Sequence, residues 1–367
     1  MKLVSFETGS VLGPVRRIGA VLGDLTDDAQ IVDLNHAYGA LLRAEGDARW
    51  QQIADAALPP DMLAFLEGED HAMERARRAI DYASNIREVD DEEGRRLRYA
   101  RRDVRLLSPV PRPRTLRDFS VYDEHMTKNR PSSEKQPFWY HFASCYKGNP
   151  DAVYGPDDPL LWPDFSDLLD PELELCAVVG KKGRNLTVEE APGYIAGYMI
   201  FVDGSARDVQ RREQLGPYKG KDFGTNLGPC LVTPDEFDER DARCGIRVNG
   251  EEWYEGNTGH RRNFWLPQLV AYASDEETLN PGDVLAAGTV GYSCSVDSGR
   301  WIQPDDVVEL WIEGIGTMKL TAKREKREMS YVRDGMQGMI ELPESAIDYP
   351  RKLKEGQIPN PFLQRGS

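Results

Sequence analysis

The spacing of hydrophobic and polar positions changes along the chain. Near the start, the apolar stretches 2–7, 16–24 and 30–35 are separated by glycine and aspartate turns and predict short strands. The segments 36–46 and 61–84 instead repeat apolar residues at helical spacing. A highly charged, proline-containing connection follows them. We therefore expect a smaller α/β amino-terminal domain that spans residues 1–105.

After this connection, short apolar segments alternate with Gly, Pro and Asp turns. These segments are 172–180, 194–203, 228–233, 244–256, 284–291 and 306–323. Many short strands with few long helices are typical of a mainly antiparallel sandwich or roll. The sequence therefore predicts an α+β protein that is mainly β, with a second domain at 106–350 and a polar tail at 351–367.

Acidic residues interrupt one of the predicted strands. Asp170, Glu172 and Glu174 alternate with apolar residues in "LDPELELCAVVGKK", and a period of two places all three on one face. Carboxylates side by side repel one another and are rarely buried unless they are paired or bound to a cation. Asp170 either ends the preceding loop or pairs with Lys181 or Arg184. For the two glutamates, a bound cation is one interpretation and pairing with arginines is the other.

Oxygen ligands favour hard cations such as Mg²⁺, Mn²⁺ or Ca²⁺. Two further acids could complete such a site. Asp203 ends the apolar run "GYMIFVD", and Asp118 lies in "LRDFSVYDEH". Taken alone, each is better explained as a strand-end or turn residue that pairs with an arginine.

Composition and charge narrow the function classes. A net charge of -16 disfavours binding to nucleic acid or to anionic lipid, because both need basic surfaces. No apolar run is long enough to span a bilayer, and the start lacks the pattern of a secretory signal. The five cysteines are scattered without a CxxC pair, so we expect a cytoplasmic protein without disulfides or a structural zinc site. The sequence contains no P-loop, GxSxG, HExxH or GxGxxG motif.

Several segments together resemble one enzyme family. They occur in the order "DFSVYDEH", "ELELCAVVGKKGRN", "YIAGYMIFVDGSARDVQ", "GKDFGTNLGPCLVT", "RVNGE", "PGDVLAAGTVG" and "DDVVELWIEGIGTMK". This set resembles the fumarylacetoacetate hydrolase (FAH) superfamily over roughly residues 118–323. The resemblance implies a carboxy-terminal β-sandwich roll, a homodimer and a divalent metal, with Mg²⁺ expected first and Mn²⁺ or Ca²⁺ as alternatives.

The resemblance also implies roles for individual residues. It places the metal ligands on Asp118, Glu172, Glu174 and Asp203. The general base of the family is a histidine seven residues after the first aspartate, which is His125 in this chain.

Further family positions are expected to contact the substrate or support the site. Lys221 and Gln210 are the candidate donors to an oxyanion, and Thr289 and Tyr140 match substrate-contacting positions. Arg207 and Asp208 are expected to pair with the metal-binding acids from beneath.

The base needs an acid to orient it. The family uses a glutamate at a position that aligns with Asp297, which is one methylene shorter. Glu124 and Asp123, next to His125 in the sequence, compete for this role.

The resemblance predicts a metal-dependent hydrolase that cleaves a carbon–carbon bond in a β-diketone or acylpyruvate-type acid, as in aromatic catabolism. In this reaction His125 would activate water, and the metal would stabilise the enolate leaving group. The first alternative is a 2-oxo acid decarboxylase, isomerase or hydratase that uses the same metal site. The second is a non-catalytic binding protein that retains the fold. A functioning pair of histidine and carboxylate favours hydrolysis, because hydrolysis needs activated water.

Overall fold

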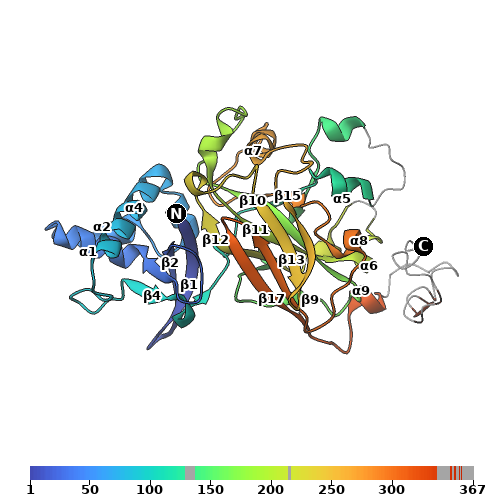
Figure 1. Ribbon diagram of the computed structural model, residues 1–367, viewed down its shortest axis with the longest axis horizontal. Helices are drawn as coiled ribbons and strands as arrows, with labels where there is room; N and C mark the ends of the chain where they lie inside the picture. The colour runs from blue at the N-terminus through green and yellow to red at the C-terminus, as the bar shows by residue number, and fades with distance from the viewer. Residues whose placement is uncertain are drawn as a thin grey trace.

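The computed structural model describes residues 1–128, 137–213 and 216–336, together with a few isolated positions after Met336. Nearly all of the predicted polar tail at 351–367 lies outside the described residues. The described chain forms an α+β fold in which β-sheet predominates, as the sequence predicted. Helices α1, α2 and α4 lie at the amino-terminal side, and one of the two sheets extends from that side through the molecule (Figure 1).

The amino-terminal part combines a small group of strands with four helices. Its elements are β1 (Lys2–Ser10), β2 (Gly13–Leu22), β3 (Gln30–Asp33), α1 (Leu34–Ala44), α2 (Trp50–Ala57), α3 (Met62–Leu66), α4 (Glu69–Asn85), β4 (Arg98–Ala100) and β5 (Arg105–Leu106). The predicted helical segment 61–84 is divided into α3 and α4 by a turn at Glu67 and Gly68, and Glu69, the first residue of α4, has a φ of 49°. The short helix α2 was not predicted, because its eight residues give only a brief helical pattern.

One twelve-stranded sheet runs through both parts of the chain. Its order is β4-β3-β2-β1-β12-β11-β10-β15-β6-β7, with β5 paired to β1 and β8 paired to β12. The strands after the amino-terminal part are β6 (Leu116–Phe119), β7 (Cys145–Gly148), β8 (Val153–Tyr154), β10 (Leu169–Val179), β11 (Ile195–Ala206), β12 (Thr225–Val232) and β15 (Val284–Thr289). Most neighbouring strands are antiparallel, whereas β15 with β6 and β12 with β8 are parallel.

A second, five-stranded sheet covers one face of the large sheet. Its order is β14-β13-β16-β17-β9, formed by β9 (Leu160–Trp162), β13 (Arg243–Val248), β14 (Glu251–Asn257), β16 (Val307–Ile312) and β17 (Gly316–Arg324). The remaining helices of the described chain are short: α5 (Asp123–Lys128), α6 (Arg207–Gln210), α7 (Leu266–Ser274), α8 (Ser295–Ser298) and α9 (Tyr331–Asp334). Figure 1 places α5, α6 and α8 at the end of the molecule opposite to α1, α2 and α4.

The central strand β10 is buried on both faces. Leu173 and Leu175 belong to the core between the two sheets, whereas Cys176 and Val178 belong to the core beneath the amino-terminal helices. Side chains two positions apart share a face. Asp170, Glu172 and Glu174 therefore lie on the same face of β10 as Cys176. They lie at the end of the molecule where α5, α6 and α8 are found.

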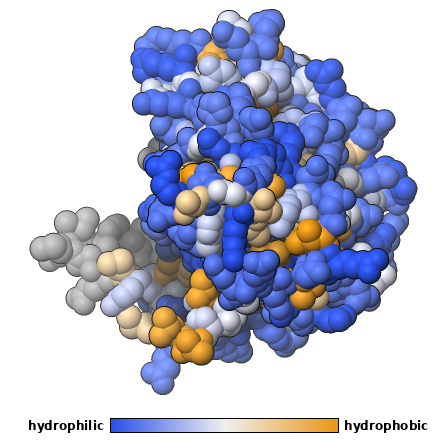
Figure 2. Space-filling model, turned by 90° about the vertical axis from the view of Figure 1, so that its left-hand side faces the viewer, coloured by the Kyte–Doolittle hydropathy of each residue, from blue (hydrophilic) through white to orange (hydrophobic). Residues whose placement is uncertain are grey.

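The outer surface on the amino-terminal side is mainly hydrophilic, and its hydrophobic side chains form small, separate groups (Figure 2). None of the helices formed by the described residues combines the length and the apolar character needed to cross a membrane.

Candidate active site

Four acids from three strands of the large sheet, β6, β10 and β11, meet at one place. Glu172 lies directly opposite Asp203 in the antiparallel pair of β10 and β11. Glu174 stands two residues further along β10 and pairs with Thr289 of β15. Asp118 reaches the same place from β6, which pairs with the other side of β15. The sheet therefore brings together acids that are distant in the sequence: Asp118 and Asp203 are 85 positions apart.

Three of these acids form a compact group of potential ligands. Asp118, Glu174 and Asp203 are buried, and each offers a carboxylate oxygen within 4.8 Å of the others. One oxygen of each acid, Oδ1 of Asp118, Oε2 of Glu174 and Oδ1 of Asp203, is buried and accepts no hydrogen bond from any described residue. Buried carboxylate oxygens without donors are costly unless a cation neutralises them. An all-oxygen donor set of this kind fits Mg²⁺, Mn²⁺ or Ca²⁺.

Glu172, the fourth predicted ligand, has protein partners on both of its oxygens. Its Oε1 accepts hydrogen bonds from Arg207 at 2.5 Å and from Thr289 at 2.6 Å. Its Oε2 accepts from Ser205 at 2.9 Å and from Lys221 at 2.5 Å. Burial alone would raise the pKa of Glu172, but the charges of Arg207 and Lys221 hold this pKa well below its usual value. Glu172 is therefore an ionised acid beside the cluster formed by Asp118, Glu174 and Asp203.

Lys221 brings a positive charge into the acid group. Its ammonium contacts Asp203 and Glu172 and lies 3.9 Å from Asp118. Burial would lower the pKa of Lys221, but the neighbouring carboxylates raise it, so the side chain is a firmly charged donor. Tyr146 donates a further hydrogen bond to Asp203 Oδ2 at 2.8 Å.

One lysine does not neutralise the whole group. Burial, together with the charge of Asp203, raises the pKa of Asp118 well above its usual value. Burial and the charge of Asp118 do the same to Glu174. Without a further cation these two acids hold protons more tightly than exposed acids do, and a divalent ion would take the place of those protons.

His125, from α5, lies between the acid group and α8. Its Nε2 is 3.7 Å from Oε1 of Glu172, and its Nδ1 is 2.7 Å from Oδ2 of Asp297. Burial lowers the pKa of His125, but the hydrogen bond and the charge of Asp297 outweigh this effect and raise it. A carboxylate on Nδ1 fixes the tautomer in which Nε2 faces the acids and can accept a proton.

The other two acids considered for orienting His125, Glu124 and Asp123, have partners other than the imidazole. Glu124 lies 3.6 Å from His260 through its Oε1, and Asp123 pairs with Arg261. Among the three candidates for orienting His125, Asp297 is the acid that lies in hydrogen-bonding contact with the imidazole.

The other predicted site residues divide into two groups. Thr289 donates to Glu172, and Gln210 accepts from Arg207 at 3.0 Å, so both border the acid group. Tyr140 does not belong to that group: its side chain is exposed and makes an edge contact with Trp139.

Arg207 lies beneath the acids, as expected, but Asp208 does not. Asp208 accepts hydrogen bonds from Ser166 at 2.6 Å and from the backbone of Asp167 at 3.0 Å. The reason is geometric, because the side chains of adjacent residues on α6 point in different directions.

Asp170 has a partner that the sequence did not suggest. It accepts a hydrogen bond from Arg207 Nε at 2.8 Å, whereas Lys181 pairs with Asp70 and Arg184 with Glu276. The alternation of Asp170 with Glu172 in the sequence could have indicated this pairing with Arg207, because it places both acids on the face that Arg207 contacts. Tyr146 was also missed, and no motif in its sequence context pointed to the site.

The sequence of the chain is similar to those of known proteins. Residues 114–322 match the sequence family described as "Fumarylacetoacetate (FAA) hydrolase C-terminal". The chain is also 32% identical over 325 residues to the oxaloacetate tautomerase fahd2, mitochondrial, of Xenopus laevis, with 87% of this chain and 89% of the relative covered. The human oxaloacetate tautomerase FAHD2A, mitochondrial, shows 32% identity over 325 residues, covering 87% of this chain and 90% of that protein. The protein belongs to the fumarylacetoacetate hydrolase family.

Solved structures share the fold. The fumarylacetoacetate hydrolase from Exiguobacterium antarcticum aligns with a TM-score of 0.62 at 24% identity, covering 88% of this chain and all of the other. A maleylpyruvate hydrolase from Sphingobium sp. SYK-6, solved with manganese(II) and pyruvate, aligns with a TM-score of 0.62 at 23% identity, covering 89% of this chain and all of the other.

Proposed function

We propose that this protein is a divalent-metal-dependent enzyme that acts on a 2-oxo acid through its enolate, and that its reaction is the keto–enol tautomerisation of an oxaloacetate-type acid. The observation that carries the proposal is the position of His125, which faces the acid group through Nε2 and an orienting carboxylate through Nδ1. Relatives of similar length with 32% identity are named oxaloacetate tautomerases, which favours tautomerisation over the predicted hydrolysis.

The acids Asp118, Glu174 and Asp203, with Glu172 beside them, would hold the metal. A divalent cation there supplies Lewis acidity that lowers the cost of forming an enolate on a bound 2-oxo acid. His125 removes a proton from the carbon next to the carbonyl, or returns one, and Asp297 keeps the imidazole in the required tautomer. Lys221 is a charged donor for the developing oxyanion, a role for which one donor is commonly worth about 3 kcal/mol.

Hydrolysis of an acylpyruvate-type acid is the second candidate. It is favoured by the same His125–Asp297 pair, because this pair could equally activate a water molecule. The two reactions differ in what the histidine deprotonates, a substrate carbon or a water oxygen.

The test is an assay of the Mg²⁺-loaded protein with enol-oxaloacetate and with an acylpyruvate. We expect rapid decay of the enol absorbance without release of a cleavage product. The variant His125→Gln should lose this activity while Mg²⁺ binding, measured by calorimetry, is retained. His260→Gln is the control, because His260 is an exposed histidine outside the acid group. Cleavage of the acylpyruvate with no tautomerase activity would favour hydrolysis, and full activity of His125→Gln would refute the role of the base.

The preference for Mg²⁺, the cytoplasmic location and the homodimer remain predictions. The metal preference is tested by adding Mg²⁺, Mn²⁺ or Ca²⁺ to EDTA-treated protein. Light scattering measures the oligomeric state.

A further inference from the structure

Asp170 is a fully buried acid that the proposed chemistry does not use. It lies at the start of β10, two residues before Glu172 and on the same face. Its carboxylate has partners from two other elements, α6 and α8. A buried carboxyl group needs hydrogen-bond donors in place of water.

The first set of donors is the beginning of α8. Asp170 Oδ1 accepts from the backbone N–H of Ser295 at 2.5 Å, and Oδ2 accepts from the N–H of Val296 at 3.2 Å. These N–H groups are at the first turn of the helix, where backbone donors have no partner within the helix. Asp297 is the next residue of the same turn, so the contact with Asp170 fixes the backbone that carries the acid facing His125.

The second donor is Arg207. Its Nε binds Asp170 at 2.8 Å, and its two terminal nitrogens bind Glu172 at 2.5 Å and Gln210 at 3.0 Å. The guanidinium is planar and rigid, so it holds Asp170 in a fixed position relative to Glu172.

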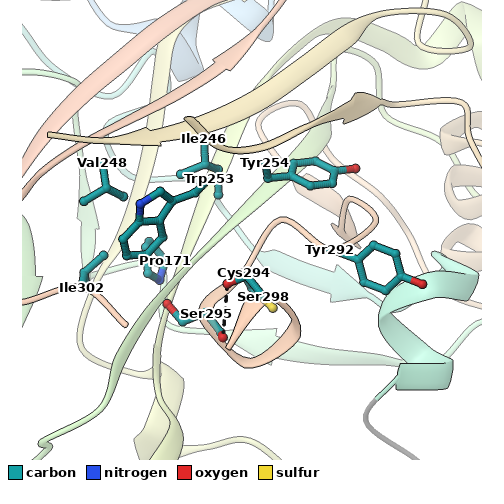
Figure 3. A pocket seen from close by; sticks show the side chains of 10 residues that line it. All are labelled: Pro171, Ile246, Val248, Trp253, Tyr254, Tyr292, Cys294, Ser295, Ser298 and Ile302. Carbon is teal, nitrogen blue, oxygen red and sulfur yellow. Dashed lines mark hydrogen bonds between the residues drawn. The ribbon is translucent and has the colours of Figure 1, made fainter. Parts of the chain in front are cut away.

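Apolar side chains and two residues of α8 line one pocket. Ile246, Val248 and Trp253 of the β13–β14 hairpin line a small pocket together with Ser295 and Ser298 (Figure 3). Apolar side chains give a helix no hydrogen-bond acceptor. The polar contacts with Asp170 therefore add to the hydrogen bonds between Ser293 and Leu173, which hold the residue two positions before α8.

We propose that Asp170 is a positioning residue that links the metal-binding acids to the orienting acid of the base. It holds the first turn of α8 so that the Asp297 carboxylate stays against Nδ1 of His125, and Arg207 fixes Asp170 itself. This inference rests on the proposed function, because it takes His125 as the base.

The first test is a double-mutant cycle in the full-length, Mg²⁺-loaded protein. Asp170→Asn keeps one oxygen for Ser295 but loses the acceptor for Val296 and Arg207. We expect kcat to fall by about ten- to a hundredfold, as a small misplacement of a catalytic group can cause, while KM and the Mg²⁺ affinity change by less than about threefold because Arg207 keeps Glu172. In Asp297→Asn, the additional change Asp170→Asn should have no further effect on kcat. Independent, multiplicative losses would overturn the proposal.

The second test reads the histidine directly. In ¹⁵N spectra of the histidine rings, the parent protein should show His125 with the proton on Nδ1, and Asp170→Asn should show a mixture of tautomers. Asp208→Asn is the matched control, because Asp208 is also a buried acid but binds Ser166 and Asp167 and not α8. An unchanged single tautomer in Asp170→Asn would overturn the proposal.

A variant on the helix side covers the case in which Asp170→Asn does not fold. Ser295→Pro removes one N–H donor and places a ring carbon against Oδ1 of Asp170, so the contact between Asp170 and α8 is lost while both side chains of the Asp170–Arg207 pair are kept. Proline is tolerated in the first turn of a helix, and the preceding Cys294 has the extended backbone that proline requires, with φ of -149° and ψ of 165°. The same loss of kcat with retained Mg²⁺ affinity is expected, and parental kcat would overturn the proposal.

Different results would refute the proposed role of the His125–Asp297 pair and the proposed role of Asp170. If Asp297→Asn changes neither kcat nor the tautomer, then the proposed role of His125 and Asp297 fails, and the role of Asp170 fails with it. If Asp297→Asn changes both but Asp170→Asn changes neither, only the role of Asp170 fails.

Discussion

Replacing Asp297 by Asn is the most direct perturbation of the proposed base. The amide has nearly the same shape as the carboxylate and can still lie near Nδ1 of His125, but it carries no charge. In the parent protein, the hydrogen bond and the charge of Asp297 raise the pKa of His125 against the effect of burial. In the variant, burial is no longer opposed by this acid, so the pKa of His125 should fall.

The size of the change follows from the 2.7 Å contact between His125 Nδ1 and Asp297 Oδ2. A hydrogen bond to a charged group is worth about 1.5–3 kcal/mol. Loss of the charge on Asp297 removes much of this stabilisation of the protonated imidazole, so the pKa of His125 should fall. Because the folded-state pKa is raised in the parent, protonated His125 stabilises the fold at pH values below its unfolded pKa. That contribution is lost as the pH rises through the folded pKa, and Asp297→Asn should remove it.

The assay is the pH dependence of kcat/KM with saturating Mg²⁺. The base must be deprotonated, so the acidic limb should move to lower pH in Asp297→Asn, and the maximal rate should fall. Glu124→Gln is the control, because Glu124 lies beside His260 and not beside the imidazole of His125. An acidic limb that stays in place in Asp297→Asn, or that moves in Glu124→Gln, would refute this reasoning.

Three further predictions concern the metal and the fold. Glu174→Gln should abolish Mg²⁺ binding in calorimetry and leave the circular dichroism spectrum unchanged. The reason is that Glu174 belongs to the cluster of three acids, and its Oε2 is buried without a hydrogen-bond donor among the described residues. Retained binding would contradict the proposed ligand set. Mg²⁺ at about 100 times its dissociation constant should stabilise the parent by about 2.7 kcal/mol, seen as a higher Tm that EDTA reverses. Gly288→Ala should lower the Tm, because Gly288 has a φ of 94° and an added Cβ would lie 2.3 Å from the carbonyl oxygen of Phe119; a Tm equal to that of the parent would show that the strand can shift there at no cost.

Much of the candidate site could be predicted because it depends on local periodicity. The alternation of Glu172 and Glu174 with apolar residues predicts a shared strand face without any knowledge of the partner strands, and the structure has both residues in one buried strand. Asp118 and Asp203 were candidates from their positions in the sequence, but only the family resemblance assigned them to the site, because their separation in sequence hides their proximity.

Other features depend on contacts between distant segments, which no pattern along the chain reports. The partner of Asp170 could not be chosen from sequence, because Lys181 and Arg184 are closer along the chain than Arg207. Asp208 follows Arg207 directly, yet the turn of α6 directs it to the 166–167 loop instead of the acids. The break between α3 and α4 coincides with a positive φ at Glu69, which the helical spacing of the sequence does not report.

The pairing of β1 with β12 has a consequence for any attempt to isolate the family-matching part of the chain. Lys2 and Leu3 are hydrogen-bonded neighbours of Val232 and Leu231, and β12 in turn pairs with β11, which carries Asp203. A fragment that begins near residue 106 would leave this stretch of β12 as an open edge, and open edges recruit other chains. By pairing with this stretch of β12, β1 covers an edge that would otherwise be open to other chains. Only β12 lies between β1 and β11, the strand that carries Asp203 of the candidate metal centre.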